Sequence, residues 1–339
     1  MHNIHTNNNY NSIDGTKLLM AFLVVGIHVG AIYCAEYPEF VNISLEIAVP
    51  FFFVCSGFFL QNKVYKSSDE LQVYKTNFIR FTRLYVLWHL IYLPLNIWYF
   101  THNNHELADN IGYALHMFIW VGEILFAWPL WYLHALFVAI AIIWIFRKYK
   151  TTMWLIWIIS ILFMLLGYFI NYEALNGEIL PLKELCQHYI DFFQTADRNG
   201  ISRGLALVVT GMMIRKHIDK INHKVIWGII CLMGALFLYY YTLPFPLLFA
   251  GTGSFLIAIS VPLPDRHVYY RIRIHSTLIY YIHMYFVMVV HLVLKSYVNN
   301  VERTYYAWML TFFISWIAAG IIDYMRKYYH FRWINHFIS

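Results

Sequence analysis

The sequence is built from long apolar stretches separated by short polar connections. A helix that crosses a bilayer needs roughly 20 mostly apolar residues. Ten stretches approach this length: about 15–34, 44–61, 84–101, 129–146, 152–171, 201–215, 225–241, 245–261, 276–296 and 305–324. In lipid, only helices and closed barrels satisfy every backbone polar group. We therefore expect an all-α polytopic membrane protein, a helix bundle with about ten transmembrane helices.

The composition supports this class. Hydrophobic residues make up 60% of the 339 residues and charged residues only 12%, whereas soluble domains average about 25% charged residues. Aromatic residues reach 20%, and Trp and Tyr are typical of membrane–water interfaces. A water-soluble protein with so few charges would lack polar groups to cover its surface.

Two details of the segmentation stay open at this stage. The segment 110–127 is also apolar, and we expect an interfacial or re-entrant helix there, separated from the next apolar segment by a break at Pro129. The segments 225–241 and 245–261 are separated only by Leu243–Pro244, so they could also form one broken helix.

The basic residues define a topology. With the N-terminus in the cytoplasm and alternating sides, nineteen of the 24 Lys and Arg residues fall inside, as the positive-inside rule predicts. The five outer ones are Lys183, Arg198, Arg203, Lys295 and Arg303. We expect a disordered cytoplasmic tail over 1–12, a transmembrane domain over 13–329 and a short cytoplasmic tail over 330–339.

The net charge of +6 is explained by this topology, so we expect a lipid bilayer and no nucleic acid as partner. The four cysteines form no CxxC pair, so we expect no zinc or thioredoxin-type site and no bound metal. Cys34 and Cys186 both fall on the outer side, where a disulfide between them is possible.

Ionisable residues within spans are costly and are functional candidates by default. In 15–34 and just before it, Asp14, Lys17 and His28 stand out. Lys17 and His28 are eleven residues apart, close to three helical turns, so they share a face at roughly 16 Å along the axis. Asp14 can pair with Lys17 three residues on. A neutral imidazole can take a proton from a hydroxyl; the alternative is a histidine satisfied by a neighbouring helix.

Two arginines, Arg80 and Arg83, lie at the inner end of 84–101. At i and i+3 they share a face and can bind phosphate as a two-armed clamp. The alternative is an anchor of the positive-inside type. In 44–61, Pro50 predicts a kink and Ser56–Gly57 a close helix contact.

Polar residues also gather at the outer ends of spans. The segment before 201–215 contains Asp197, Arg198 and Asn199, and Arg203 lies inside the span or at its edge and needs a partner. Glu46 and Asp197 are candidates for that partner. Other polar or aromatic residues of the spans are interpreted first as interface or packing residues: Trp131, His134 and His283.

These motifs together resemble a known family. The set IDG-x-K-x10-H, VPFFF-x-x-SGFFL, R-x-x-R and LWYL on ten helices is similar to the acyltransferase-3 family of membrane acyltransferases. The most specific parts are Lys17-x10-His28 and Arg80-x-x-Arg83. AVPFFF, LWYL and Arg198-Asn199-Gly200 also resemble the membrane module of vancomycin-resistance serine racemases.

The resemblance implies an enzyme of the bacterial plasma membrane that moves an acyl group, often acetyl, from cytoplasmic acyl-CoA to an acceptor hydroxyl. Acceptors would be extracytoplasmic glycans or lipid-linked cell-wall precursors. His28 would be the catalytic base, with Asp14 and Lys17 in the same site. Arg80 and Arg83 would bind the CoA phosphates. Candidate acceptor-binding residues are Asp197, Arg198, Asn199, Trp131 and Glu46. The alternatives are a serine transporter and a glycan-export subunit, neither with acyl chemistry.

Overall fold

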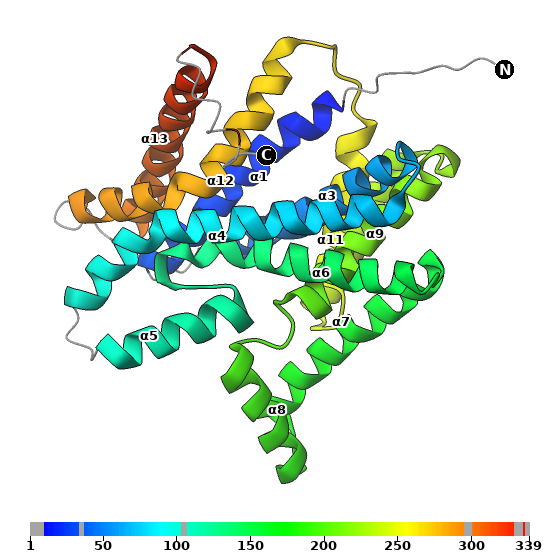
Figure 1. Ribbon diagram of the computed structural model, residues 1–339, viewed down its shortest axis with the longest axis horizontal. Coiled ribbons are helices and arrows are strands. Elements are labelled where there is room, and N and C mark those ends of the chain that lie inside the picture. The colour runs from blue at the N-terminus through cyan, green and yellow to red at the C-terminus, as the bar shows by residue number, and fades with distance from the viewer. Residues whose placement is uncertain (1–9, 34–36, 103–106, 295–299, 329–334, 336–339) are drawn as a thin grey trace. The chain divides into compact units, whose positions relative to one another are not determined.

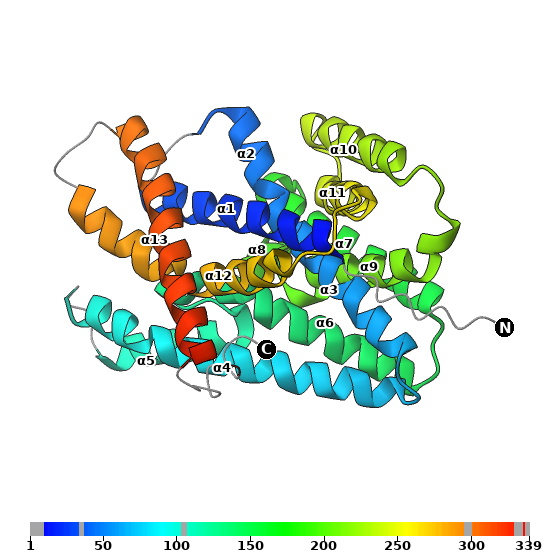
Figure 2. The same ribbon diagram turned by 90° about the horizontal axis from the view of Figure 1, so that it is seen from above.

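The computed structural model describes residues 10–33, 37–102, 107–294, 300–328 and 335. Within these ranges the chain forms helices and no strand, as the all-α prediction requires. The helices divide into two compact units, which are described separately (Figures 1 and 2). Unit 1 contains 1–48, 223–230 and 253–331, and unit 2 contains 49–222, 231–252 and 332–339.

Unit 1 is built around three long helices that lie side by side. They are α1 (Asn11–Tyr33), α12 (His267–Leu294) and α13 (Asn300–Tyr328), and the short α2 (Glu39–Glu46) contacts α1 (Figures 1 and 2). The indole of Trp308 on α13 donates to the Phe22 carbonyl of α1 at 2.8 Å. The Phe22 and Trp308 rings also stack, with centroids 4.8 Å apart.

Contacts at both ends of unit 1 define the helix directions. Near the start of α1, Asp14 forms an ion pair with Arg273 of α12 at 3.7 Å. At the end of α1, the Tyr33 ring lies 4.9 Å from the ring of His291 near the end of α12. Arg303, near the start of α13, lies over the same Tyr33 ring. Therefore α1 and α12 run parallel and α13 runs antiparallel to both, as alternating spans predict.

Unit 2 contains most of α3 (Ala48–Tyr65) and all of the helical elements that follow it along the chain up to residue 222. Here α6 packs against α4 and α9, and α7 packs against α8 and α9. The elements are α4 (Glu70–His102), α5 (Leu107–His116), the 3-10 helix η2 (Leu125–Leu130), α6 (Trp131–Lys148), α7 (Met153–Asn176), α8 (Leu180–Phe193) and α9 (Leu205–His217). Short π-helical turns at Met117–Val121 (η1) and Gly200–Gly204 (η3) extend α5 and precede α9, and the 3-10 turn η4 (Ile218–Lys220) comes after α9.

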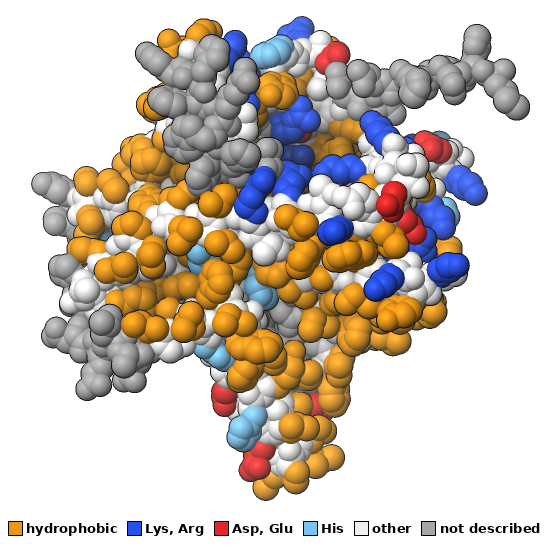
Figure 3. Space-filling view, in the orientation of Figure 1, with side chains coloured by type: hydrophobic (Ala, Val, Ile, Leu, Met, Phe, Trp, Pro, Cys, Tyr) orange, Lys and Arg blue, Asp and Glu red, His pale blue; other side chains and the backbone are white. Residues whose placement is uncertain are grey.

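The basic connections of unit 2 meet at one end of the unit. Arg147, at the end of α6, donates to Glu70 at the start of α4 at 2.7 Å. Arg215, near the end of α9, donates to Asn62 near the end of α3 at 3.0 Å. Figure 3 shows blue side chains gathered over this end of α3, α4 and α6 and orange ones along the flank of α4. The expected inner loops of this unit are therefore neighbours in space.

Glycine allows α3 and α9 to pack closely. A Cβ atom added to Gly57 of α3 would lie 1.8 Å from the Val208 carbonyl oxygen of α9. One added to Gly211 of α9 would lie 2.1 Å from the Val54 carbonyl oxygen of α3. Small residues at helix contacts let backbones approach in lipid. The close contact predicted at Ser56–Gly57 is thus confirmed.

Six helical stretches are long and apolar enough to span a bilayer in the described part of the chain, and these establish a multi-pass helical membrane protein. They are Asn11–Tyr33, Glu39–Tyr65, Ile111–Lys148, Met153–Asn176, His267–Leu294 and Glu302–Tyr328. The other four expected segments are helical but shorter or more polar, including α10 (Lys224–Tyr240) and α11 (Pro246–Ser260). The ten-span count therefore stays a prediction.

Several local expectations differ from the structure. The break after 110–127 falls at Gly122, which has φ of 86° in the left-handed region, rather than at Pro129, which sits inside η2. Pro50 lies in the first turn of α3, three residues after Ile47, the single turn residue that separates α2 from α3. The helical stretch is therefore interrupted just before Pro50, where the kink was predicted. The connection between the expected spans 152–171 and 201–215 contains α8, which the search for spanning segments did not indicate.

The ends of the chain and one connection refine the expected boundaries. Helix α1 begins at Asn11, inside the expected tail 1–12, and residues 1–9 lie outside the described residues, as do 330–334 and 336–339. Between α10 and α11, Thr242 and Phe245 have φ of 52° and 79°. These left-handed residues separate two helices, so the single broken helix is not formed.

Candidate active site

The inner end of α1 contains a charged cluster. The Asp14 side chain is buried and lies 3.7 Å from both the Lys17 ammonium and the Arg273 guanidinium. A buried carboxylate is costly unless it is paired, and two cations compensate this one. The predicted Asp14–Lys17 pair is therefore present, with Arg273 from α12 as a third member that spacing along the sequence could not reveal.

The face of α1 between Lys17 and His28 is apolar. Ala21, Val24 and Val25 are each no more than 2% exposed. The polar groups of α1 therefore form two separate clusters, although Lys17 and His28 share one face of the helix. The sequence carried this information, because these residues share the face of Lys17 and His28 at helical spacing.

At the level of His28, the structure brings two histidines together. His28 is 7% exposed, and its ring centroid lies 5.1 Å from that of His283 on α12, with the rings tilted by 40°. Both Asp14 and His28 thus face α12, and neither points out from the protein. His283, interpreted from the sequence as a packing residue, is fully buried and is the immediate neighbour of the candidate base.

The hydrogen bonds of His283 determine which of its nitrogens carries hydrogen. Its Nδ1 lies 3.0 Å from the Ile279 carbonyl oxygen and 2.9 Å from the Tyr280 carbonyl oxygen. Carbonyl oxygens only accept, so Nδ1 is the protonated nitrogen. In the neutral ring Nε2 then carries the lone pair. This Nε2 atom is buried and has no hydrogen-bond partner among the described residues.

Arg80 and Arg83 lie on α4 in unit 2, at the end where the basic connections gather. Arg80 is half-buried and Arg83 is exposed. Lys63 of α3 donates to Asn77 of α4 at 2.8 Å and is near enough to Arg80 for their charges to repel. Three cations from two helices therefore lie toward this end of unit 2.

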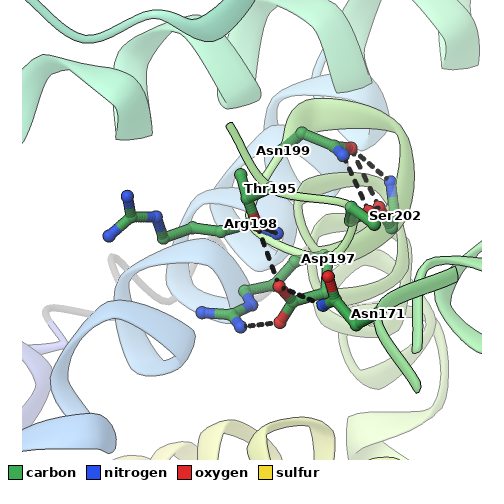
Figure 4. A network of polar contacts seen from close by, with 8 residues as sticks. Asn171, Thr195, Asp197, Arg198, Asn199 and Ser202 are labelled. Atoms are coloured by element: carbon green, nitrogen blue, oxygen red, sulfur yellow. Dashed lines mark hydrogen bonds and ion pairs between the residues drawn. The ribbon is translucent and has the colours of Figure 1, made fainter. Parts of the chain in front are cut away.

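Asp197 is the centre of a closed network at the start of η3. Its carboxylate forms an ion pair with Arg203 and accepts from Asn171 at 2.9 Å and Thr195 at 3.0 Å (Figure 4). Burial by itself would raise the pKa of the Asp197 carboxyl. The charge of Arg203 and the donated hydrogen bonds outweigh burial and hold this pKa below its ordinary value.

Asn199 caps the helix that begins after it. Its Oδ1 accepts from the backbone N–H groups of Ile201 and Ser202 at 2.9 Å each, and its Nδ2 donates to the Ala196 carbonyl at 2.9 Å. An asparagine at this position satisfies donors that the first turn leaves unpaired. Asn199 therefore has a structural task in holding the loop.

Arg198 points away from this network (Figure 4). Its guanidinium forms an ion pair with Glu123 at 2.8 Å and lies over the Trp131 ring at 5.6 Å. The Trp128 indole also hydrogen-bonds Glu123. The structure thus brings together two of the predicted acceptor-binding residues, Arg198 and Trp131. Glu123 was missed as a site residue, because its partner lies far away in the sequence.

The remaining predictions fall elsewhere. Glu46 is exposed at the end of α2 in unit 1, whereas Arg203 has Asp197 as its partner. Cys34 lies outside the described residues, so its pairing with Cys186 stays a prediction. No cluster of three or more His, Cys, Asp or Glu side chains able to hold a metal occurs in the part of the chain that the structure describes.

The helices and these clusters define a multi-pass membrane protein with ionisable groups inside its spans. The family model for an acyltransferase domain matches residues 10–323. The chain therefore belongs to the acyltransferase-3 family.

One curated relative is named an amino-acid racemase, from Enterococcus faecalis. It is 30% identical over 241 residues, which cover 67% of this chain. They cover 31% of the relative, so the chain spans about a third of its length. No solved structure matches the chain.

Proposed function

We propose that this chain is an acyltransferase that moves an acyl group, in the simplest case acetyl, from cytoplasmic acyl-CoA to a hydroxyl of an extracytoplasmic glycan or lipid-linked cell-wall precursor. The enzyme would act in the plasma membrane of a bacterium, as the origin of the racemase relative suggests. The observation that carries the proposal is His28, a buried imidazole on α1 beside the second imidazole of His283.

His28 would act as general base. It removes the proton from the acceptor hydroxyl, the oxygen bonds to the thioester carbonyl carbon, the carbon–sulfur bond breaks, and the proton passes to the departing thiolate. A positioned base contributes about 10²–10⁴-fold to such a step. The low exposure of His28 supports this role, since bulk water that would compete with the acceptor is kept away.

Arg80 and Arg83 would bind the phosphates of the donor. Arginine binds phosphate as a planar fork, and the neighbouring Lys63 adds a third positive charge. Lys17, held by Asp14, would add charge at the inner end of α1. Because Ala21, Val24 and Val25 are packed, a donor that reaches His28 along this face of α1 requires the face to open.

The acceptor would contact the outer polar residues. Arg198 is partly exposed and lies over the buried Trp131 ring, so its guanidinium is held in place and can meet a sugar hydroxyl. Asp197 and Asn199 would hold the loop that presents Arg198. Glu46 would contribute from α2.

Binding of acetyl-CoA to the purified protein tests the donor part of this proposal. Changing Arg80 and Arg83 together to Ala should weaken binding by at least about 100-fold, since each lost charged hydrogen bond contributes about 1.5–3 kcal/mol. The matched control changes Lys66 and Lys75 to Ala, which removes the same charge from exposed sites nearby. An equal loss of acetyl-CoA affinity in both variants would show that the basic surface attracts the anion in general and that Arg80 and Arg83 form no specific site.

A second candidate function is amino-acid transport, for which the racemase relative is the observation. The matched region would then supply an amino acid rather than transfer an acyl group. Uptake of labelled serine into vesicles that contain the protein and no acyl-CoA would favour this candidate. A glycan-export subunit would show neither uptake nor acetyl-CoA binding.

A further inference from the structure

His283 was interpreted from the sequence as a packing residue, and the structure gives it a more specific environment. It is fully buried on α12, and its ring contact on α1 is His28. Its Nδ1 is committed to the carbonyl oxygens of Ile279 and Tyr280. Its Nε2 has no hydrogen-bond partner among the described residues. A buried acceptor atom without a partner is uncommon in proteins and calls for an explanation.

The tautomer of His283 is fixed by its own helix. Because the two carbonyl oxygens can only accept, hydrogen stays on Nδ1 and the lone pair stays on Nε2. The ring is therefore an oriented acceptor inside an apolar region. The ring centroids lie 5.1 Å apart, and the two imidazoles form no direct hydrogen bond, because Nε2 of His283 has no partner among the described residues. A small ring rotation or one bridging water would connect them.

We propose that His283 is a positioning residue for His28, with its Nε2 lone pair accepting hydrogen from one nitrogen of His28 while the other nitrogen of His28 faces the acceptor hydroxyl. This inference rests on the proposed role of His28 as general base. A base that is itself oriented by a third group is the general arrangement of activated nucleophiles. Here a neutral imidazole takes the orienting place that a carboxylate occupies in many hydrolases.

The proton balance is unchanged by His283. His28 gains the proton of the acceptor hydroxyl and gives it to the thiolate that leaves. During that interval the hydrogen on the other nitrogen of His28 points to Nε2 of His283, which stabilises the imidazolium. His283 ends the cycle as it began, protonated on Nδ1. Because His283 stays neutral, no second full charge is buried inside the spanning helices.

Two amide substitutions separate this role from packing. The side-chain amide of Gln reaches the position of Nε2, whereas the shorter amide of Asn reaches the position of Nδ1. His283→Gln should retain acyl transfer within about fivefold, because its carbonyl oxygen can replace the lone pair. His283→Asn and His283→Ala should lower kcat by about 10- to 100-fold, with the KM for acetyl-CoA unchanged.

His89 offers a matched control in unit 2. It is also a buried helical histidine, its Nδ1 lies 2.9 Å from the Tyr85 carbonyl oxygen, and its Nε2 has no hydrogen-bond partner among the described residues. Its ring neighbours include Tyr85 and Phe118. His89→Gln and His89→Asn should therefore affect kcat equally, and only through stability.

The experiment measures kcat, KM and melting temperature for these variants beside His28→Gln. A lower kcat in His283→Asn, together with a kcat in His283→Gln close to that of the wild type, supports the inference. A wild-type kcat in His283→Asn overturns it. It is also overturned if His283→Asn and His283→Gln lose kcat equally and in proportion to their melting temperatures, as expected for the two His89 variants. Full activity in His28→Gln would instead refute the proposed general base, whatever the His283 variants do.

Discussion

Two regions carry polar groups next to or within apolar helices, and they use those groups in opposite ways. In the loop that leads into η3, the Asp197 carboxylate has three partners and the Asn199 amide has partners on both its oxygen and its nitrogen. Between α1 and α12, His283 lacks a partner for Nε2 among the described residues. The first region is a closed network, and the second keeps an acceptor atom available.

This difference separates structural from chemical roles. A network in which every hydrogen bond is formed makes the surrounding loop rigid. Its stability does not depend on bound substrate. A buried acceptor without a partner costs stability in the resting protein, and such costs collect at functional sites. Variants in the closed network should therefore change stability, whereas variants at the histidine pair should change turnover.

The largest effect in the closed network is expected for Asp197→Asn. The substitution leaves the half-buried Arg203 guanidinium without its counter-charge and should lower the free energy of unfolding by about 1–3 kcal/mol. Melting of the detergent-purified protein measures this loss, with acetyl-CoA affinity as the internal control. If stability were unchanged and acetyl-CoA affinity fell, the network would not be structural.

A smaller effect is expected at the helix cap. Asn199→Ala removes the acceptor for the N–H groups of Ile201 and Ser202 and should cost about 1 kcal/mol. Asn199→Asp is the matched variant, since a carboxylate also caps a helix start. Its stability should stay close to that of the wild type. Equal losses in both variants would show that the amide nitrogen, rather than the cap, is what the loop needs.

The smallest effect concerns pH. The pKa of Asp197 is held below its ordinary value of 3.8 in the folded protein, so its contribution is complete above that value and is lost as pH falls through the lowered pKa. The difference in melting temperature between wild type and Asp197→Asn should therefore be constant from about pH 7 to about pH 5 and shrink below about 4. A difference in melting temperature that grows in acid would contradict the assignment of a negative charge to Asp197 in the folded protein.

Much of the helix pattern was predictable because length and apolarity alone specify spanning segments. Each of the ten expected segments is helical over most of its described residues, and the inner connections of unit 2 meet at one end, as the basic residues indicated. Local breaks were harder. Gly122 adopts a left-handed conformation that nothing in the apolar pattern requires, and α8 is not a spanning segment, so a search for spans passes over it.

The candidate site was predictable only within single helices. Spacing placed Asp14 beside Lys17, and the structure contains that pair. It gave no information on which other helix would face them, so Arg273 and His283 were not assigned to the site. Glu123 was missed for the same reason. Pairings between helices depend on tertiary packing, which one sequence does not reveal.

His28 is the residue on which the proposed acyl transfer depends most directly. The decisive measurement is transfer of labelled acetyl from acetyl-CoA by the purified wild type and by His28→Gln, with His89→Gln as the same substitution at a buried helical histidine of unit 2. We expect transfer by His28→Gln to fall at least about 100-fold, with normal expression and melting, and His89→Gln to retain turnover per folded molecule. Wild-type transfer by His28→Gln would contradict the proposed mechanism.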